Sequence, residues 1–437
     1  MCLICYVIII HILYLRYYGD AFEYSYDGDL FIYNYNREKY FFCLLETLII
    51  CKVTIRNMMD MSLTAITLVI LNYLYFIPGV VQQAVTNEPW SYIIFFFAFW
   101  LMMEFWLYKL PPHTYSRLGC KLSKINKERY LLYLSIFAII LAFVLMTYHG
   151  KSFSISNFQE TLLDVYGVRA EETLAGTHWL IVNLEIWTAY FIVIATGYYS
   201  YLRKWPFVLL LVIAEISVFL IAANRIFLFF EIAAILVGAF HITAKKMNIL
   251  MLLIAIVLLV EVNIIDVGLV VNDVFRRFAI VPNRISGFYF DYFSTHSPDY
   301  LRSLYDRTFS LLGLHSYYAD HSISRIIGDV YFGRVVGCNT GLVGGSMFCF
   351  GFFSLIFSTF GYIMALRIFE GAIYQFEKPY ITLLLAIILG SLSINTYALL
   401  ANLFNTNYFL LLYLSLIPLG IKTVKTNNTR NNENIIY

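Results

Sequence analysis

The sequence predicts an all-α polytopic integral membrane protein with about 12 transmembrane helices and a large extracytoplasmic loop. Of its 437 residues, 60% are hydrophobic and 13% are charged, and the mean hydropathy is +0.72. A soluble domain is nearer to half apolar and a quarter charged. Aromatic residues make up 18% of the chain, and such rings are favoured at the two membrane interfaces. The composition therefore excludes a soluble globular domain.

Each predicted span is an apolar run of about 20 residues, the length that crosses the hydrocarbon core as a helix. The first run lacks a basic leader and a small-residue cleavage site, so we expect a retained helix and not a secretory signal. The second is the weakest, because it is short and carries Glu46 and Lys52. The predicted runs are residues 2–18, 40–55, 61–81, 90–108, 130–148, 179–199, 206–222, 225–244, 249–266, 346–369, 380–400 and 408–421.

Lysine and arginine in the connections predict the orientation, because short cytoplasmic connections carry an excess of both residues. The basic connections fall on one side if the helices alternate, so we expect this side and both chain termini to be cytoplasmic. The basic connections are residues 109–129, 203–204, 245–246 and the tail from 422.

The predicted spans divide the chain into four parts. The last part is polar and rich in asparagine, a composition typical of disorder. The parts are residues 1–266, a helix bundle with a smaller outer loop at 149–178; residues 267–345, the large extracytoplasmic loop; residues 346–421, the C-terminal transmembrane helices; and residues 422–437, a disordered cytoplasmic tail.

The interval 267–345 has an unusual charge composition, with seven arginines and six aspartates but neither lysine nor glutamate. Arginine suits phosphate recognition, because its planar guanidinium donates two parallel hydrogen bonds and stays charged. Attraction to anionic lipid is the alternative explanation, although it would favour lysine equally. Within the interval we predict one helix, from Ser297 and Pro298 to Gly313, which is also the pattern of a helix lying on the bilayer surface.

Several motifs of common enzymes are incomplete. Gly150-Lys151-Ser152 resembles the end of a P-loop, but the earlier glycine is missing. Asp27-Gly28-Asp29 is a DxD pair of the kind that shares a divalent cation, yet it also fits a turn. The seven cysteines show no disulfide framework or spaced metal set. We therefore expect no cofactor and no metal.

Ionisable residues inside apolar helices are costly and are candidates for function. Arg225 is either a substrate contact or the partner of a buried acid, Glu215 or Glu231. Glu104, Glu185 and Glu215 form a proton path or pair with neighbouring helices. In the smaller outer loop, Arg169 adds a cation on the outer side.

A set of short motifs stands in the central part of the chain, most densely at residues 275–351. They are Phe275-Arg276-Arg277-Phe278, Val281-Pro282, Tyr289-Phe290-Asp291-Tyr292-Phe293, Ile326-Ile327-Gly328, Tyr331-Phe332-Gly333, Asn339-Thr340-Gly341 and Gly351. With the helix tally and the two unequal outer loops, these motifs resemble the O-antigen (oligosaccharide repeat-unit) polymerase family.

The resemblance implies an enzyme of the bacterial inner membrane that joins oligosaccharide repeat units carried on polyprenyl pyrophosphate. Its partners would be this lipid-linked substrate, membrane lipids, and flippase and chain-length regulator proteins, with no nucleic acid. Guanidinium groups would stabilise the pyrophosphate leaving group, and a base would activate the acceptor hydroxyl. The substrate-binding candidates are Arg276, Arg277 and Arg284 for one pyrophosphate, Arg169, Arg225 and Arg325 for the other substrate, and Asn339; the candidate bases are His321, Asp320 and Asp291.

Two other functions fit parts of the same pattern. A ligase that moves finished glycan onto a lipid core would also have many spans and an outer loop with arginine and histidine. A flippase for the lipid-linked unit would place its charges along the helix bundle and have short connections. The 79-residue interval at 267–345 favours an enzyme over the flippase.

Overall fold

The computed structural model describes residues 1–17, 33–60, 62–111, 127–150, 179–222, 225–265, 270–303, 313–333, 337–338, 340–373 and 379–395, with Ser154, Phe158 and Thr161. Every secondary-structure element in this part of the chain is a helix, as predicted. Within these described residues, six helices are long and apolar enough to cross a membrane: Leu63–Val85, Trp90–Lys109, Leu131–Tyr148, Trp205–Ala222, Lys246–Ile264 and Leu342–Glu370.

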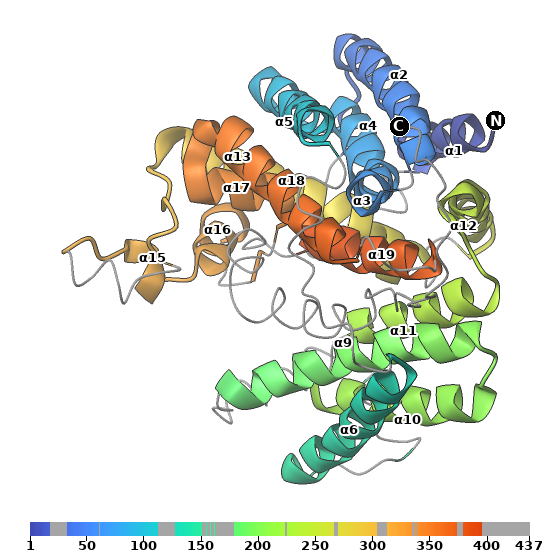
Figure 1. The fold of residues 1–437 in the computed structure, drawn as a ribbon. Helices are drawn as coiled ribbons and strands as arrows, with labels where there is room; N and C mark the ends of the chain where they lie inside the picture. The colour runs from blue at the N-terminus through green and yellow to red at the C-terminus, as the bar shows by residue number, and fades with distance from the viewer. Residues whose placement is uncertain are drawn as a thin grey trace, which may run out of the picture.

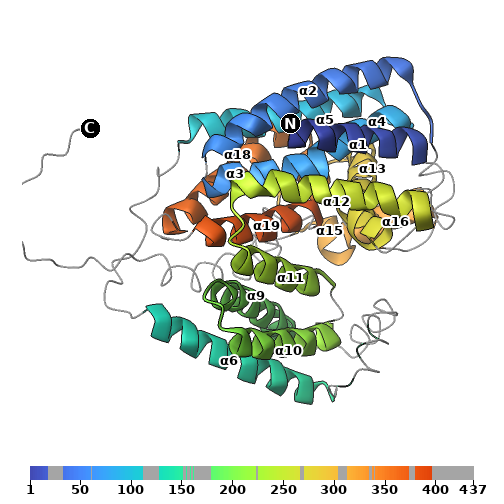
Figure 2. The same cartoon turned by 90° about the vertical axis from the view of Figure 1, so that its right-hand side faces the viewer.

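The helices form two groups in space (Figures 1 and 2). The smaller group consists of α6 (Lys127–Tyr148), α9 (Trp179–Tyr201), α10 (Trp205–Ala222) and α11 (Arg225–Ala239). The last helix described, α19 (Pro379–Asn395), packs on α3 in the larger group and on α9 and α11, so it joins the two. The larger group begins with α1 (Cys2–Tyr17), α2 (Arg37–Asp60), α3 (Leu63–Leu71), η3 (Asn72–Phe76), α4 (Ile77–Val85), α5 (Trp90–Lys109) and α12 (Ala244–Ile265).

Most of the predicted apolar runs coincide with these helices, and the last run, 408–421, lies outside the described residues. The predicted run 346–369 is a broken helix made of α17 (Leu342–Phe350), a 3₁₀ turn η6 (Gly351–Phe353) and α18 (Ser354–Ile373). The break falls at Gly351, whose φ of 56° suits a residue without a side chain.

The interval 267–345 contains more helix than predicted. It holds η5 (Val270–Ile280), α13 (Val281–Thr295), α15 (Tyr317–Asp320) and α16 (Ile323–Phe332). The single helix predicted from Ser297 is wrong at its start, because residues 300–303 form turns; residues 304–312 lie outside the described part. Helices η5 and α13 were not predicted because they carry polar residues on the faces that pack against the bundle, and a search for apolar runs does not detect such helices.

In the described part of the chain η3 and η5 are π-helical, and η5 and α13 pack against the segment formed by η3 and α4. A π-turn releases backbone carbonyls from the usual helical bonding, and such turns are frequent at functional sites. Asn283 of α13 donates to the Tyr75 carbonyl of η3 at 3.1 Å, and Gln82 of α4 donates to the Ile280 carbonyl of η5 at 3.2 Å. Gly79 permits this approach, since a Cβ there would lie 2.4 Å from the Asn283 amide oxygen.

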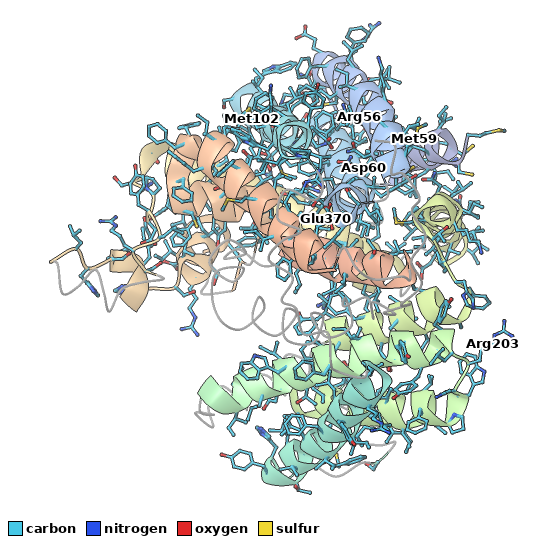
Figure 3. The ribbon with its side chains drawn as sticks, viewed as in Figure 1. Arg56, Met59, Asp60, Met102, Arg203 and Glu370 are labelled. Carbon is cyan, nitrogen blue, oxygen red and sulfur yellow. The ribbon has the colours of Figure 1, made fainter. Side chains whose placement is uncertain are left out.

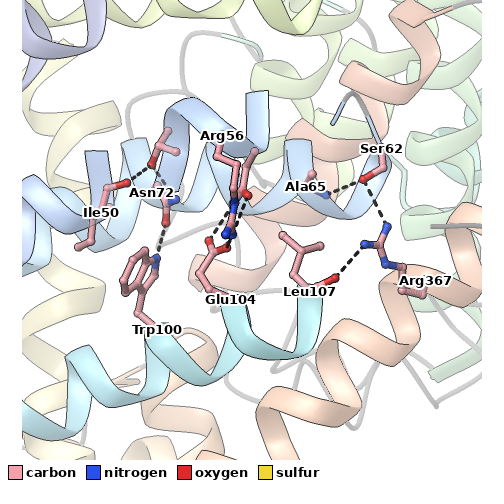
Figure 4. Close-up of polar contacts among 11 residues, drawn as sticks. Ile50, Arg56, Ser62, Ala65, Asn72, Trp100, Glu104, Leu107 and Arg367 are labelled. Carbon is pink, nitrogen blue, oxygen red and sulfur yellow. Dashed lines mark hydrogen bonds and ion pairs between the residues drawn. The ribbon is translucent and has the colours of Figure 1, made fainter. Parts of the chain in front are cut away.

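Buried polar contacts tie the larger group together (Figure 4). Trp100 donates to Asn72 at 2.9 Å, and Asn57 donates to the Glu104 carboxylate at 2.9 Å. Arg56 forms an ion pair with Glu104 at 3.4 Å and is 57% exposed. Arg367 of α18 donates to the Leu107 carbonyl near the end of α5 at 3.2 Å. These contacts satisfy polar groups that are costly when buried without partners.

Candidate functional site

An arginine and a glutamate form a buried ion pair where the interval 267–345 meets the rest of the bundle. Arg284 of α13 donates through Nη1 to Oε1 of Glu88, in the connection between α4 and α5. Their side chains are 10% and 5% exposed. Gly287, nearly one turn after Arg284, makes room for Glu88, because a Cβ there would lie within 3.0 Å of its carboxylate.

Aromatic rings connect this ion pair to a surface carboxylate. The guanidinium of Arg284 lies over the Phe288 ring, 4.8 Å from its centroid. Phe288 stacks on Tyr331 of α16 with ring centroids 4.7 Å apart, and the Tyr331 hydroxyl donates to Asp291 at 2.6 Å. Asp291 is exposed. We call Glu88, Arg284, Phe288, Tyr331 and Asp291 the acid–arginine cluster.

Burial changes the acid–base behaviour of two members of the cluster. It raises the pKa of Glu88 above its usual 4.5, although Arg284 and Lys39 oppose this effect. It also raises the pKa of Tyr331, and the hydrogen bond to Asp291 raises it further. Tyr331 therefore remains a protonated donor at neutral pH, whereas Glu88 ionises at a higher pH than an exposed glutamate.

A chain of hydroxyl groups anchors α13 beside this cluster. Ser286 bonds with the Tyr75 hydroxyl at 2.8 Å and with the Thr340 hydroxyl at 2.7 Å. Tyr289 donates to the Cys338 carbonyl at 3.1 Å. These bonds hold the segment before α17, which includes Thr340 of the Asn-Thr-Gly motif, against the helix that carries Arg284 and Asp291.

Asp299 organises the turn after α13 and is fully buried. One of its carboxylate oxygens accepts from the backbone and hydroxyl of Ser303 at 2.9 and 2.7 Å, and the other accepts from Ser316. Arg302 donates to the Asp299 carbonyl at 2.8 Å. This carboxylate therefore stabilises the turn.

Two histidines lie on exposed surface near the end of α13. His296 stacks on Tyr292 with ring centroids 4.0 Å apart, and His321 stacks on Tyr317 with centroids 4.6 Å apart. Among the described residues, no contact links either histidine to Asp291. His321, a predicted base, thus sits on a separate aromatic pair at the C-terminal end of α15.

The structure separates the predicted arginines by burial. Arg276 and Arg277 lie on η5, where Arg276 is nearly buried and Arg277 half-buried. Arg325 is exposed on α16. Of the predicted site residues, the described contacts bring Arg284 and Asp291 into one cluster, through Phe288 and Tyr331, and do not extend it to Arg325.

Four predicted site residues have no described side chain. Arg169 and Asn339 lie outside the described residues, and for Arg225 and Asp320 only the backbone is described, at the start of α11 and the end of α15. The predictions for these residues therefore remain predictions.

Sequence reasoning missed Glu88 and Tyr331. Glu88 stands in a short polar connection between two long apolar runs. Tyr331 belongs to the Tyr-Phe-Gly motif noted in the sequence, but nothing in one sequence pairs it with Asp291.

Two buried acids of the smaller helix group, Glu185 and Glu231, have polar partners of their own. Glu185 contacts His149 at 2.9 Å, and Glu231 accepts from Thr196 at 2.7 Å. Glu215 lies beside Glu231. Glu104 belongs to the larger group, so the described contacts do not join these acids into one proton path.

Comparisons with models of protein families, with curated proteins and with solved structures found no match for this chain.

Proposed function

We propose that the chain is a glycosyltransferase that joins polyprenyl-pyrophosphate-linked oligosaccharide units into O-antigen or capsular polysaccharide. In this proposal the protein lies in the bacterial inner membrane with about 12 spans and both termini cytoplasmic. The reaction takes place at the outer face. The six helices able to cross a membrane support the membrane setting.

The observation that carries the proposal is the acid–arginine cluster. It combines a guanidinium, suited to a pyrophosphate, with an exposed carboxylate that a protonated tyrosine holds in place. Except for Glu88, the cluster residues lie on α13 and α16, on the right-hand side of the bundle in Figure 2. Arg203, in the basic turn between α9 and α10, lies at the opposite edge of Figure 3 from these helices.

The chemistry needs no nucleotide, because the donor sugar is already activated. The acceptor hydroxyl oxygen attacks the anomeric carbon of the donor and forms a C–O bond. The bond from that carbon to the pyrophosphate oxygen breaks, and the pyrophosphate leaves with the electron pair. Asp291 takes the hydroxyl proton, with Asp320 and His321 as the other candidate bases. Arg276, Arg277 and Arg284 stabilise the charge on the leaving group.

The test uses the purified protein in lipid, supplied with one lipid-pyrophosphate-linked repeat unit and no other protein. We expect a ladder of multiples when the products are separated by size. Replacing Arg276 or Arg277 by alanine should reduce the ladder about a hundredfold, the usual effect of removing a charge-stabilising donor. Arg203→Ala, on the opposite edge of the molecule, serves as the control and should leave the ladder unchanged.

The alternatives give different products in the same assay. Release of the lipid carrier only after an acceptor core is added would identify a ligase. Movement of the substrate across the bilayer without reaction would identify a flippase. A full ladder from both arginine variants would contradict the proposal that Arg276 and Arg277 of η5 stabilise the leaving group.

A further inference from the structure

We propose that Glu88 is an internal counter-anion that a diphosphate group must displace from Arg284 when substrate binds. The inference rests on the proposed function for the identity of the anion, and it assigns Glu88 as a positioning residue. In the substrate-free protein Glu88 holds the guanidinium; in the complex the diphosphate takes its place.

Stability alone does not explain why the ion pair between Glu88 and Arg284 is buried. Burying two charges carries a large desolvation penalty for each ion, and an apolar pair of similar size is often as stable. The packing nevertheless accommodates the pair, because Gly287 leaves space for the Glu88 carboxylate and Phe288 supports the Arg284 guanidinium. A role in binding explains why the chain keeps this arrangement.

The position of the pair suits exchange with a ligand. Glu88 is buried, but its neighbours Asn87, Pro89 and Trp90 are exposed, so the pair lies directly beneath the surface. The backbone carbonyl of Glu88 accepts from Lys39 of α2. This contact anchors the connection while the carboxylate changes partner.

Charge explains the direction of the exchange. A diphosphate carries more negative charge than one carboxylate and can accept two parallel hydrogen bonds from a guanidinium. An internal anion leaves the arginine available to a ligand for only a fraction of the time. The apparent affinity for the ligand is the intrinsic affinity multiplied by that fraction. Glu88 therefore lowers affinity while it keeps Arg284 in place.

The first test is titration of the purified full chain in neutral-lipid nanodiscs with inorganic pyrophosphate, followed by calorimetry. Glu88→Gln keeps the shape and an accepting oxygen but removes the charge, so we expect pyrophosphate to bind about tenfold more tightly. Arg284→Lys should weaken binding. Glu104→Gln neutralises another buried carboxylate with an arginine partner, at the other end of α5, and should change nothing.

The pH profile gives a readout that a merely structural role would not move. As pH falls, protonation of Glu88 releases Arg284, so the affinity gap between the native protein and Glu88→Gln should close. The protonation of pyrophosphate itself also changes its affinity with pH. Comparing the two proteins at the same pH removes this contribution. The charged and titratable groups that face Glu88 are Arg284, Lys39, Asp291, Tyr92 and Tyr331.

Other outcomes overturn the inference. Equal or weaker pyrophosphate binding by Glu88→Gln would show that the carboxylate only supports the fold, and absence of binding by both proteins would show that Arg284 does not receive a diphosphate. Displacement of pyrophosphate by phosphatidylglycerol vesicles would assign Arg284 to lipid headgroups. Failure of polymerisation with the exchange intact would contradict only the proposed function.

Discussion

At the scale of single residues, a hydrogen bond from Tyr331 of α16 orients the exposed carboxylate of Asp291 on α13. Tyr331 is held by stacking on Phe288, so its hydroxyl has a defined direction. The bond to Asp291, at 2.6 Å, then fixes one carboxylate oxygen and leaves the exposed group oriented. A base must be positioned in this way before its protonation state matters.

Tyr331→Phe tests this role, because it removes the donor and keeps the stacked ring. On the proposed function, we expect kcat for chain elongation to fall about tenfold with little change in KM, and stability to change by no more than about 1 kcal/mol. Elongation kinetics and thermal unfolding in detergent provide the two measurements. Tyr318→Phe removes a longer bond of 3.4 Å to the Ser297 carbonyl and is the matched control; equal effects from both variants would argue against a special role for Tyr331.

At the scale of elements, close backbone approach sets the position of α17. Gly341 precedes this helix and lies against the C-terminal part of α19, where a Cβ would be 2.2 Å from the Ile394 carbonyl oxygen. The obstacle is backbone, so it cannot turn aside as a side chain would. Gly341 also follows Thr340, whose hydroxyl bonds with Ser286 of α13.

Gly341→Ala should therefore force α17 and α19 apart and destabilise the protein by about 3 kcal/mol, at the upper end of the cost of overpacking. The measurement is the thermal unfolding midpoint in detergent. Gly337→Ala is the neutral comparison, because a Cβ at Gly337 would meet nothing within 4 Å. An unchanged midpoint for Gly341→Ala would mean that the two helices do not approach this closely.

At the scale of the whole molecule, one buried arginine joins helices that are far apart in the sequence. Arg367 of α18 pairs with Glu370 at 2.7 Å and donates to the carbonyls of Leu107 and Leu110 at 3.2 and 2.8 Å. Glu370 in turn accepts from the Thr64 hydroxyl at 2.7 Å. The contacts link α3, α5 and α18 at one place in the larger helix group.

Arg367→Met should destabilise the protein by roughly 3–5 kcal/mol, because Glu370 would remain buried without its cation. Adding Glu370→Gln should recover part of this loss. Arg56→Met is the contrasting variant: Arg56 is 57% exposed and pairs with Glu104, so its loss should cost no more than about 1 kcal/mol. Equal losses from the Arg367 and Arg56 variants would contradict the importance of burial.

The sequence alone determined the helical class and most helix positions, because apolar runs of membrane length leave few other structures. The predicted run 90–108, for example, lies within the helix Trp90–Lys109. The helices at residues 270–295 were not predicted, because polar residues such as Arg276, Asn283 and Arg284 interrupt the apolar pattern there.

Only the tertiary structure decided which polar groups are buried and what they contact. Arg284 and Glu88 are 196 residues apart in the chain, and no local pattern pairs them. The physical reason is that hydrophobicity acts on each segment by itself, whereas a buried charge is tolerated only where a partner from another segment meets it.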